Sequence, residues 1–162
     1  GSEMCIRDRV YKEMGLKIKK LSNSSYEIYC KTLKPIKKIS TKEFPGYPTD
    51  LQAQLIATQL KSGLKSKVVE NIFENRFMHV PELRRFGANL SIKGNTVTID
   101  KSSNLLGAEV MATDIRASFS LIIAAMMSKG KTVINRIYHL DRGYEDFDLK
   151  LKKCGVNISR KK

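Results

Sequence analysis

The spacing of apolar side chains predicts two long buried helices, one after Asp50 and the other after Asp114. In both segments the apolar residues stand three or four positions apart, which places them on one face of a helix. The two apolar stripes are Leu51, Leu55, Ile56 and Leu60 in the first helix, and Ile115, Phe119, Ile122, Ile123 and Met126 in the second.

Both helices also have signals at their ends. Asp50 and Asp114 each follow a threonine, and their side-chain oxygens can accept hydrogen bonds from the free N–H groups of a first helical turn. Gly63 and Gly130 stand where the apolar stripes stop. Because glycine adopts the left-handed conformation without a steric penalty, we expect these two residues to end the helices.

Strands are predicted wherever β-branched residues cluster between turn signals. Short helices that end at Gly87 and Gly155 precede two of these strands, and Gly94-Asn95 is typical of a two-residue hairpin turn. The predicted strands cover residues 67–72, 89–93, 96–99, 131–137 and 156–159.

The order of helix, strand, loop, short helix and strand occurs twice along the chain. Residues 50–54 are echoed by residues 114–118, and residues 82–90 by residues 150–158. A third copy of the last element occurs at residues 11–18. Units of this kind cannot bury their apolar faces alone, so we expect an α/β fold in which they pack around a shared axis.

The repeat also divides the chain. Residues 1–9 show no periodicity that continues into Val10, and we set them aside as a tag remnant or artefact. Residues 10–43 form the end of a preceding unit and a connection, and two repeat units follow at 44–110 and 111–162. Because the chain starts inside the last element of a unit, we expect it to be part of a longer protein.

The composition changes this picture little. A net charge of +14 raises nucleic acid as a partner, but the lysines are scattered and no aromatic residues stand between them as a stacking platform. We favour solvated surfaces and no specific nucleic-acid site, with a basic nucleic-acid-binding module as the alternative. No apolar run approaches the roughly 18 residues of a membrane span, so no membrane partner is expected.

The cysteines and histidines indicate no metal site. Cys30 and Cys154 lack CxxC spacing and have no histidine at ligand distance, so we expect two reduced, packed cysteines in a cytoplasmic protein. His79 and His139 are expected to form local hydrogen bonds.

Four segments, in this order, resemble the UDP-N-acetylglucosamine enolpyruvyl transferases, and a weaker resemblance extends over residues 10–162. It implies an inside-out α/β barrel of repeated helix–strand units, with helices inside and sheets outside, incomplete in this chain. The resembling segments are residues 44–54, 73–83, 111–118 and 136–145.

The implied activity is transfer of the enolpyruvyl group of phosphoenolpyruvate to the 3′-hydroxyl of UDP-N-acetylglucosamine, the first committed step of peptidoglycan synthesis, with no cofactor. The enolpyruvyl transferase of shikimate metabolism shares the architecture and is an alternative. Residues 76–83 favour the nucleotide-sugar enzyme, because they resemble that family.

The resemblance assigns roles to single residues. Asp50 matches the general base for the sugar hydroxyl, although a helix cap is the competing interpretation. Arg76, Arg116 and Arg142 match the arginines that bind phosphoenolpyruvate, and guanidinium groups suit carboxylates and phosphates. A surface salt bridge is the usual alternative for an arginine.

Three further residues have two open interpretations each. Asp114 either orients the site or caps its helix. Ile72 and Phe73 match the lining of the nucleotide-sugar pocket, or else belong to the core of a strand. The family's catalytic acid is a cysteine on a mobile loop that nothing here matches, so we expect the chain to need the remainder of the enzyme for activity and to be marginally stable or to associate.

Overall fold

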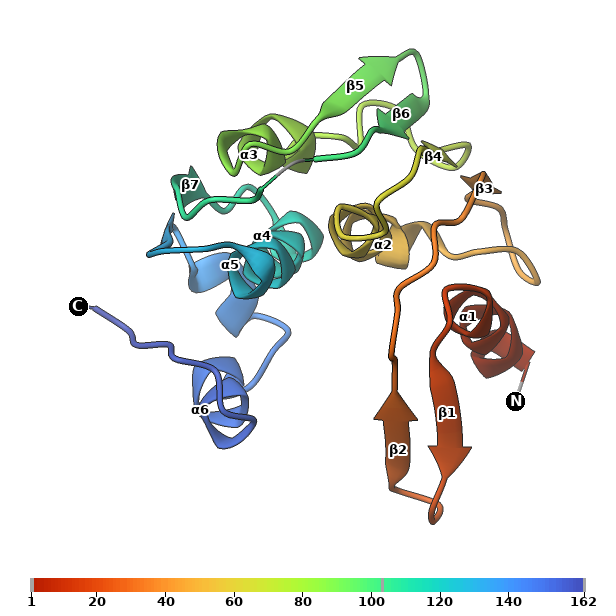
Figure 1. Ribbon diagram of the computed structural model, residues 1–162, viewed down its shortest axis with the longest axis horizontal. Coiled ribbons are helices and arrows are strands. Elements are labelled where there is room, and N and C mark those ends of the chain that lie inside the picture. Colours follow the sequence, from red (N-terminus) through yellow and green to blue (C-terminus); the bar gives the residue numbers. More distant parts are fainter. Residues whose placement is uncertain (1, 103, 162) are drawn as a thin grey trace.

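Two helices lie side by side at the centre of the molecule, α2 (Gln52–Gln59) and α4 (Ile115–Met127) (Figure 1). The computed structural model describes residues 2–102 and 104–161, with the side chains of residue 6 and residues 8–102 in the first range. Nearly every residue of α2 is buried, including three glutamines. Both helices predicted from the apolar stripes therefore exist, and the interior is formed by helices.

A four-stranded sheet covers α2 on one side, in the upper part of Figure 1. β3 runs parallel to β4, and β6 pairs antiparallel with both β4 and β5. The two-residue connection Gly94-Asn95 joins β5 to β6, with Lys93 opposite Thr96, so the predicted hairpin is confirmed. In the order of the sheet, the strands are β3 (Ile39–Ser40), β4 (Ser66–Val69), β6 (Thr96–Ile99) and β5 (Leu90–Lys93).

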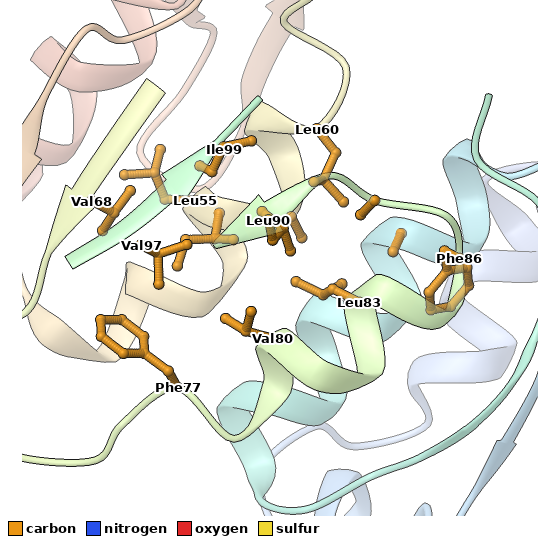
Figure 2. Close-up of a cluster of buried hydrophobic side chains, with 14 of the residues drawn as sticks. Leu55, Leu60, Val68, Phe77, Val80, Leu83, Phe86, Leu90, Val97 and Ile99 are labelled. Carbon is orange, nitrogen blue, oxygen red and sulfur yellow. The ribbon is translucent and has the colours of Figure 1, made fainter. Parts of the chain in front are cut away.

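The main core lies between this sheet, α2 and the short helix α3 (His79–Arg85), as Figure 2 shows. Val68 and Val97 stand opposite each other on β4 and β6, and both are buried. Leu83 and Phe86 close the core from the α3 side and have no exposed surface. Alternate residues of β4 and β6 thus point inward, as half-buried strands require.

α4 is buried on more than one side, which the predicted stripe did not anticipate. Leu121 belongs to the same core as α2, whereas Ile122 packs in a second cluster with Leu140 and Phe147. Met126, at the end of the stripe, is 45% exposed. The reason is that α4 contacts α2 and α3 on one side and α5 on another, so a single stripe is not its only buried face.

The chain continues with a smaller sheet and two short helices. β7 (Glu109–Met111) runs parallel to β8 (Val133–Asn135), and α5 (Tyr138–Asp141) and α6 (Phe147–Lys153) follow. β8 is shorter than the predicted strand at 131–137, because Arg136 has a φ of +59° and leaves the extended region. β4 likewise stops at Val69, where a loop begins.

The helices that precede the echoed glycines, α1 (Ser2–Glu13), α3 and α6, end in the same way. Gly15, Gly87 and Gly155 each follow one residue after such a helix and have φ near +90°. The N–H of Val156 donates to the carbonyl of Leu151, the bond that closes a Schellman motif. The helix-ending role predicted for Gly87 and Gly155 is confirmed.

Two predictions about ends and strands are wrong. α2 ends at Gln59 and α4 at Met127, so Gly63 and Gly130 lie in the turns that follow the helices. Residues 156–159 form no strand. No neighbouring strand lies beside them within the described part of the chain, and a strand is stable only when its backbone groups are paired.

The beginning of the chain forms helix α1 (Ser2–Glu13) and a hairpin of β1 (Lys17–Lys20) and β2 (Tyr26–Tyr29). The hairpin extends away from the centre at the lower right of Figure 1, and Ile28 is 62% exposed. α1 runs through most of the segment that the sequence set apart as residues 1–9. The origin of that segment and the three-part division of the chain stay predictions.

Candidate active site

Asp50 lies in a single turn of 3-10 helix, η1 (Thr49–Leu51), that precedes α2. The N-cap of η1 is Pro48 and that of α2 is Leu51, and neither helix start has a side-chain cap. The predicted cap by Asp50 is therefore wrong. The extra 3-10 turn moves the start of the α-helix past Asp50, so its carboxylate has other partners.

Those partners are two arginines from different parts of the chain. Oδ1 of Asp50 accepts a hydrogen bond from Nε of Arg116 at 2.6 Å and another from Nη2 of Arg76 at 3.2 Å. The Asp50 side chain is 62% exposed, and those of Arg76 and Arg116 are 21% and 38% exposed. One carboxylate oxygen thus joins three of the predicted site residues at the surface.

Burial and the two arginines together set the pKa of Asp50. Partial burial acts to raise the pKa of Asp50, but the hydrogen bond and charge of Arg116, with those of Arg76, outweigh it and lower the pKa below its usual value of 3.8. Asp50 is therefore ionised at neutral pH. Two guanidinium groups face one carboxylate, which leaves the cluster with an excess positive charge that suits an anionic ligand.

Arg76 is held by the loop that follows β4. Its Nη1 donates to the hydroxyl of Thr49 at 2.8 Å, and its Cζ lies 4.5 Å from the centre of the Phe73 ring. Asn75, with a φ of +54°, turns the chain just before it, a conformation that asparagine tolerates. The arginine is thus fixed by a hydrogen bond, an ion pair and a cation–π contact.

Arg116 stands in the first turn of α4, two residues after the N-cap residue Asp114. Oδ1 of Asp114 accepts hydrogen bonds from the backbone N–H of Arg116 at 2.8 Å and of Ala117 at 3.0 Å. The capping interpretation of Asp114 is therefore confirmed. The cap fixes the start of α4, from which the Arg116 side chain reaches across to Asp50 in the other repeat unit.

Arg142 lies at the end of α5 and is exposed. The next residue, Gly143, packs so closely on Ile115 that an added Cβ would lie 2.2 Å from Cδ1 of that residue. The turn at Arg142 therefore lies against the start of α4, next to Arg116. Within the described residues, no hydrogen bond or ion pair joins Arg142 to Asp50.

Ile72 and Phe73 lie in the loop after β4, so the predicted place in a strand core is wrong. Phe73 is 54% exposed and its ring lies under Arg76, while Ile72 is half-buried. The pairing of β4 with β6 ends at Val69, and the backbone N–H groups of Ile72 and Phe73 donate to the side chain of Glu70.

Glu70 is the residue of this site that the sequence did not reveal. It is 2% exposed, and its carboxylate accepts hydrogen bonds from two hydroxyls and two backbone N–H groups. The available signal was an acidic residue directly after the β-branched pair Val68-Val69, where a strand was expected to continue. A buried acid at such a place needs several donors.

The two histidines do not form the expected local hydrogen bonds through Nε2. Nε2 of His79 and Nε2 of His139 are buried without a hydrogen-bond partner among the described residues. Burial lowers the pKa of His79 to about 4, against the opposing charge of Asp114. His79 is therefore neutral near pH 7 and acts as a core residue beside Phe77.

Cys30 and Cys154 form no disulfide with each other. Both are free, as expected, but both are exposed, so the expectation that they are packed is wrong. The described residues include no group of three or more histidine, cysteine or acidic side chains placed to hold a metal ion. No helix in the described part of the chain is both long and apolar enough to cross a membrane.

Comparison with protein families gives one match over most of the chain. The family model of EPSP synthase (3-phosphoshikimate 1-carboxyvinyltransferase) matches residues 3–151. The chain belongs to the EPSP synthase family. The match begins inside the segment that the sequence set aside as residues 1–9.

Curated members of the family similar to this chain are named UDP-N-acetylglucosamine 1-carboxyvinyltransferase. The one from Pelagibacter ubique is 53% identical over 153 residues, which cover 93% of this chain and 36% of the relative. The one from Helicobacter hepaticus is 51% identical over 150 residues, 93% of this chain and 35% of the relative. The chain therefore spans about a third of the length of these relatives.

Solved structures confirm the fold. The enolpyruvyl transferase NikO from Streptomyces tendae superposes with a TM-score of 0.84 at 24% identity, over 96% of this chain and 36% of NikO. An EPSP synthase from Acinetobacter baumannii gives a TM-score of 0.62 at 15% identity, over 83% of this chain and 32% of that one. The predicted enolpyruvyl-transferase fold, incomplete in this chain, is confirmed.

Proposed function

We propose that this chain forms one side of the active site of an enolpyruvyl transferase that converts phosphoenolpyruvate and UDP-N-acetylglucosamine. Two observations support the proposal: the names of the relatives, and the cluster in which Asp50 lies between Arg76 and Arg116. Because the chain spans about a third of those relatives, the activity belongs to a longer protein that contains it.

The reaction needs a base and a set of cations. In the addition step, the 3′-oxygen of the sugar loses its proton and bonds to C2 of phosphoenolpyruvate, while C3 gains a proton. In the elimination step, C3 loses a proton and phosphate leaves C2, which restores the double bond. The proton donor to C3 would come from outside this chain, as the resemblance implies.

Asp50 is the proposed base for the sugar hydroxyl. In the structure its carboxylate is ionised and exposed, so it can accept a proton from a hydroxyl within hydrogen-bond distance. The two arginines that lower its pKa would also bind the carboxylate and phosphate of phosphoenolpyruvate. Substrate anions would then offset the arginine charge and raise the pKa of Asp50, which makes it a stronger base in the ternary complex.

The remaining site residues have supporting roles in this proposal. Arg142, beside the start of α4, would complete the anion clamp with Arg76 and Arg116 once substrate is bound. Ile72 and Phe73 would contact the nucleotide sugar, for which the half-buried and exposed positions of their side chains leave them accessible. Asp114 would orient Arg116 by capping α4. The cell-wall role and the cytoplasmic location are part of the same proposal.

The test uses a full-length transferase in which this chain replaces the matching segment of the Pelagibacter ubique relative. Phosphate release from phosphoenolpyruvate should require UDP-N-acetylglucosamine, and Asp50→Asn should lower kcat by about 10²–10⁴-fold. The matched control is Asp100→Asn, which removes a half-exposed carboxylate that forms an ion pair with Lys65. Full activity of the Asp50→Asn variant would refute Asp50 as the base.

A second candidate is transfer to shikimate 3-phosphate, favoured by the description of the family model itself. The same preparation should release no phosphate when shikimate 3-phosphate replaces the nucleotide sugar. Turnover with shikimate 3-phosphate, and none with UDP-N-acetylglucosamine, would select this second candidate.

A further inference from the structure

Glu70 is a buried carboxylate that connects three segments of the chain. Its Oε1 accepts hydrogen bonds from the Thr41 hydroxyl at 2.8 Å and from the backbone N–H groups of Ile72 at 2.9 Å and Phe73 at 3.2 Å. Its Oε2 accepts a hydrogen bond from the Thr49 hydroxyl at 2.8 Å. With 2% exposure, the carboxyl oxygens are stable there because these donors replace water.

The bond to Thr49 determines how Thr49 meets Arg76. A hydroxyl has one proton, and the Thr49 proton is directed to Oε2 of Glu70. The lone pairs of Thr49 are then free to accept from Nη1 of Arg76 at 2.8 Å. Thr49 is also the chain neighbour of Asp50, so the same contact sets the separation of the arginine from the carboxylate.

A second connection leads from Glu70 to the other side of Arg76. The backbone N–H of Phe73 bonds to Oε1 of Glu70, and the Phe73 ring lies 4.5 Å from the guanidinium carbon. The ring and the Thr49 hydroxyl are thus both positioned by one carboxylate. Arg76 is only 21% exposed, in line with a side chain held in one orientation.

We propose that Glu70 is a positioning residue that holds Arg76 beside Asp50 through Thr49 and the Phe73 loop. Glu70 touches no reacting atom in this arrangement and acts only through its neighbours. The part of the proposal that concerns substrate rests on the proposed function, because Arg76 is assigned there to phosphoenolpyruvate. The part that concerns the geometry of Arg76 and Asp50 does not.

A matched pair of variants distinguishes a role of Glu70 in positioning Arg76 from a role in merely holding the loop after β4 in place. Thr49→Val removes the hydroxyl between Glu70 and Arg76, and Thr41→Val removes the hydroxyl on the opposite side of the same carboxylate. Both changes are nearly isosteric. Thr49→Ser keeps the hydroxyl and should behave as the unchanged protein, and Thr49→Ala repeats the test should the valine variant unfold.

Glu70→Gln tests the carboxylate itself. Its two oxygens accept from donors on both sides, so an amide in either orientation turns one N–H group toward another donor. We expect effects on Arg76 at least as large as those of Thr49→Val. The Glu70→Gln/Thr49→Val double variant should disturb Arg76 no more than Glu70→Gln alone, because both changes interrupt the same connection from Glu70 to Arg76.

The first measurement is steady-state kinetics in the full-length chimeric transferase. Thr49→Val should raise KM for phosphoenolpyruvate roughly tenfold, as expected for a lost hydrogen bond to a charged group, with KM for UDP-N-acetylglucosamine unchanged. Thr41→Val should leave both values unchanged. Equal kinetic effects of the two valine variants would refute positioning and indicate loop closure alone.

The second measurement needs no substrate and uses the 162-residue chain. The pKa of the Asp50 carboxyl, followed by carbon NMR, should rise in Thr49→Val and stay the same in Thr41→Val, because only the first change releases Arg76. An unchanged pKa in Thr49→Val overturns the proposal. If the chimera shows no turnover while this pKa shift appears, the proposed function fails and the positioning role stands.

Discussion

The Thr-Asp pair at the start of the two central helices has different partners in the two repeat units. Asp114 accepts hydrogen bonds from two backbone N–H groups of α4 and serves as its cap. Asp50 makes no cap, and its carboxylate binds Arg76 and Arg116 instead. The same two residues therefore serve the helix in one unit and the surface site in the other.

The difference follows from how each helix begins. α4 starts directly after Asp114, whose extended backbone (φ −156°, ψ 174°) is usual for an N-cap. α2 is preceded by the 3-10 turn η1, which puts Leu51 at the cap position. Because Asp50 caps neither η1 nor α2, its carboxylate is available to bind Arg76 and Arg116.

The largest effect is expected from weakening the packing of α4 against α2. Leu121 of α4 is fully buried in the core that it shares with α2, and Leu121→Ala should lower the free energy of unfolding by about 2–5 kcal/mol. Urea denaturation of the 162-residue chain measures this. Leu64→Ala, at a residue that is 65% exposed, is the control and should change little. A small loss for Leu121→Ala would mean that the units are not held by this contact.

The next largest effect is expected from replacing Arg116, which connects the two aspartates. Arg116 is capped by Asp114 through its backbone and bound to Asp50 through its side chain. Arg116→Lys keeps the charge but loses the guanidinium geometry, and should cost about 2–4 kcal/mol of transition-state stabilisation in the full-length transferase. The ratio kcat/KM for phosphoenolpyruvate reports it, and an unchanged ratio would exclude Arg116 from the clamp.

The protonation of His79, whose pKa is influenced by burial and by the charge of Asp114, can be tested through the pH dependence of stability. Burial lowers the pKa of His79 from 6.5 to about 4, with the charge of Asp114 opposing the shift. Between these values the unfolded chain binds a proton that the folded chain does not. Stability should therefore fall by about 3 kcal/mol as the pH drops from 6.5 to 4.

Thermal unfolding of the chain across this pH range, with His79→Gln as the comparison, checks this prediction. The variant has no titrating group at this position, so its stability should depend less on pH there. Equal slopes for the two proteins would contradict a buried neutral His79.

The smallest effect concerns the cap itself. Asp114→Ala should destabilise the chain by about 0.5–2 kcal/mol, because two N–H groups of α4 lose their acceptor. Asp50→Ala should cost less, since Asp50 caps nothing and its ion pairs are exposed. Urea midpoints measured side by side would show the order, and a reversed order would contradict the two roles.

Much of the fold could be predicted because it depends on neighbours in sequence. The hairpin turn at Gly94 and the helix end at Gly87 each require a positive φ that glycine adopts readily, and both are found. The strand at 156–159 could not be predicted correctly, because β-branched residues favour extended backbone but cannot supply the partner strand.

The site was predicted only in part for the same reason. The resemblance named Asp50, Arg76 and Arg116, and the structure brings these three together. It could not reveal Glu70, whose importance lies in bonds to segments far from it in sequence, such as Thr41. Nor could it exclude the cap by Asp50, because a one-turn shift of the helix start leaves no mark on the spacing of apolar residues.

The sequence by itself determined the repeat, its glycines, the two central helices and the resemblance to the family. These depend on side-chain type and spacing over a few residues, where local sterics and burial periodicity dominate. The tertiary structure decided that Asp50 faces Arg76 and Arg116 and that Glu70 is buried where it bonds to the Thr49 hydroxyl. Charge and hydrogen bonding act between groups in space, so only the packing of α2 against α4 could bring those groups within reach.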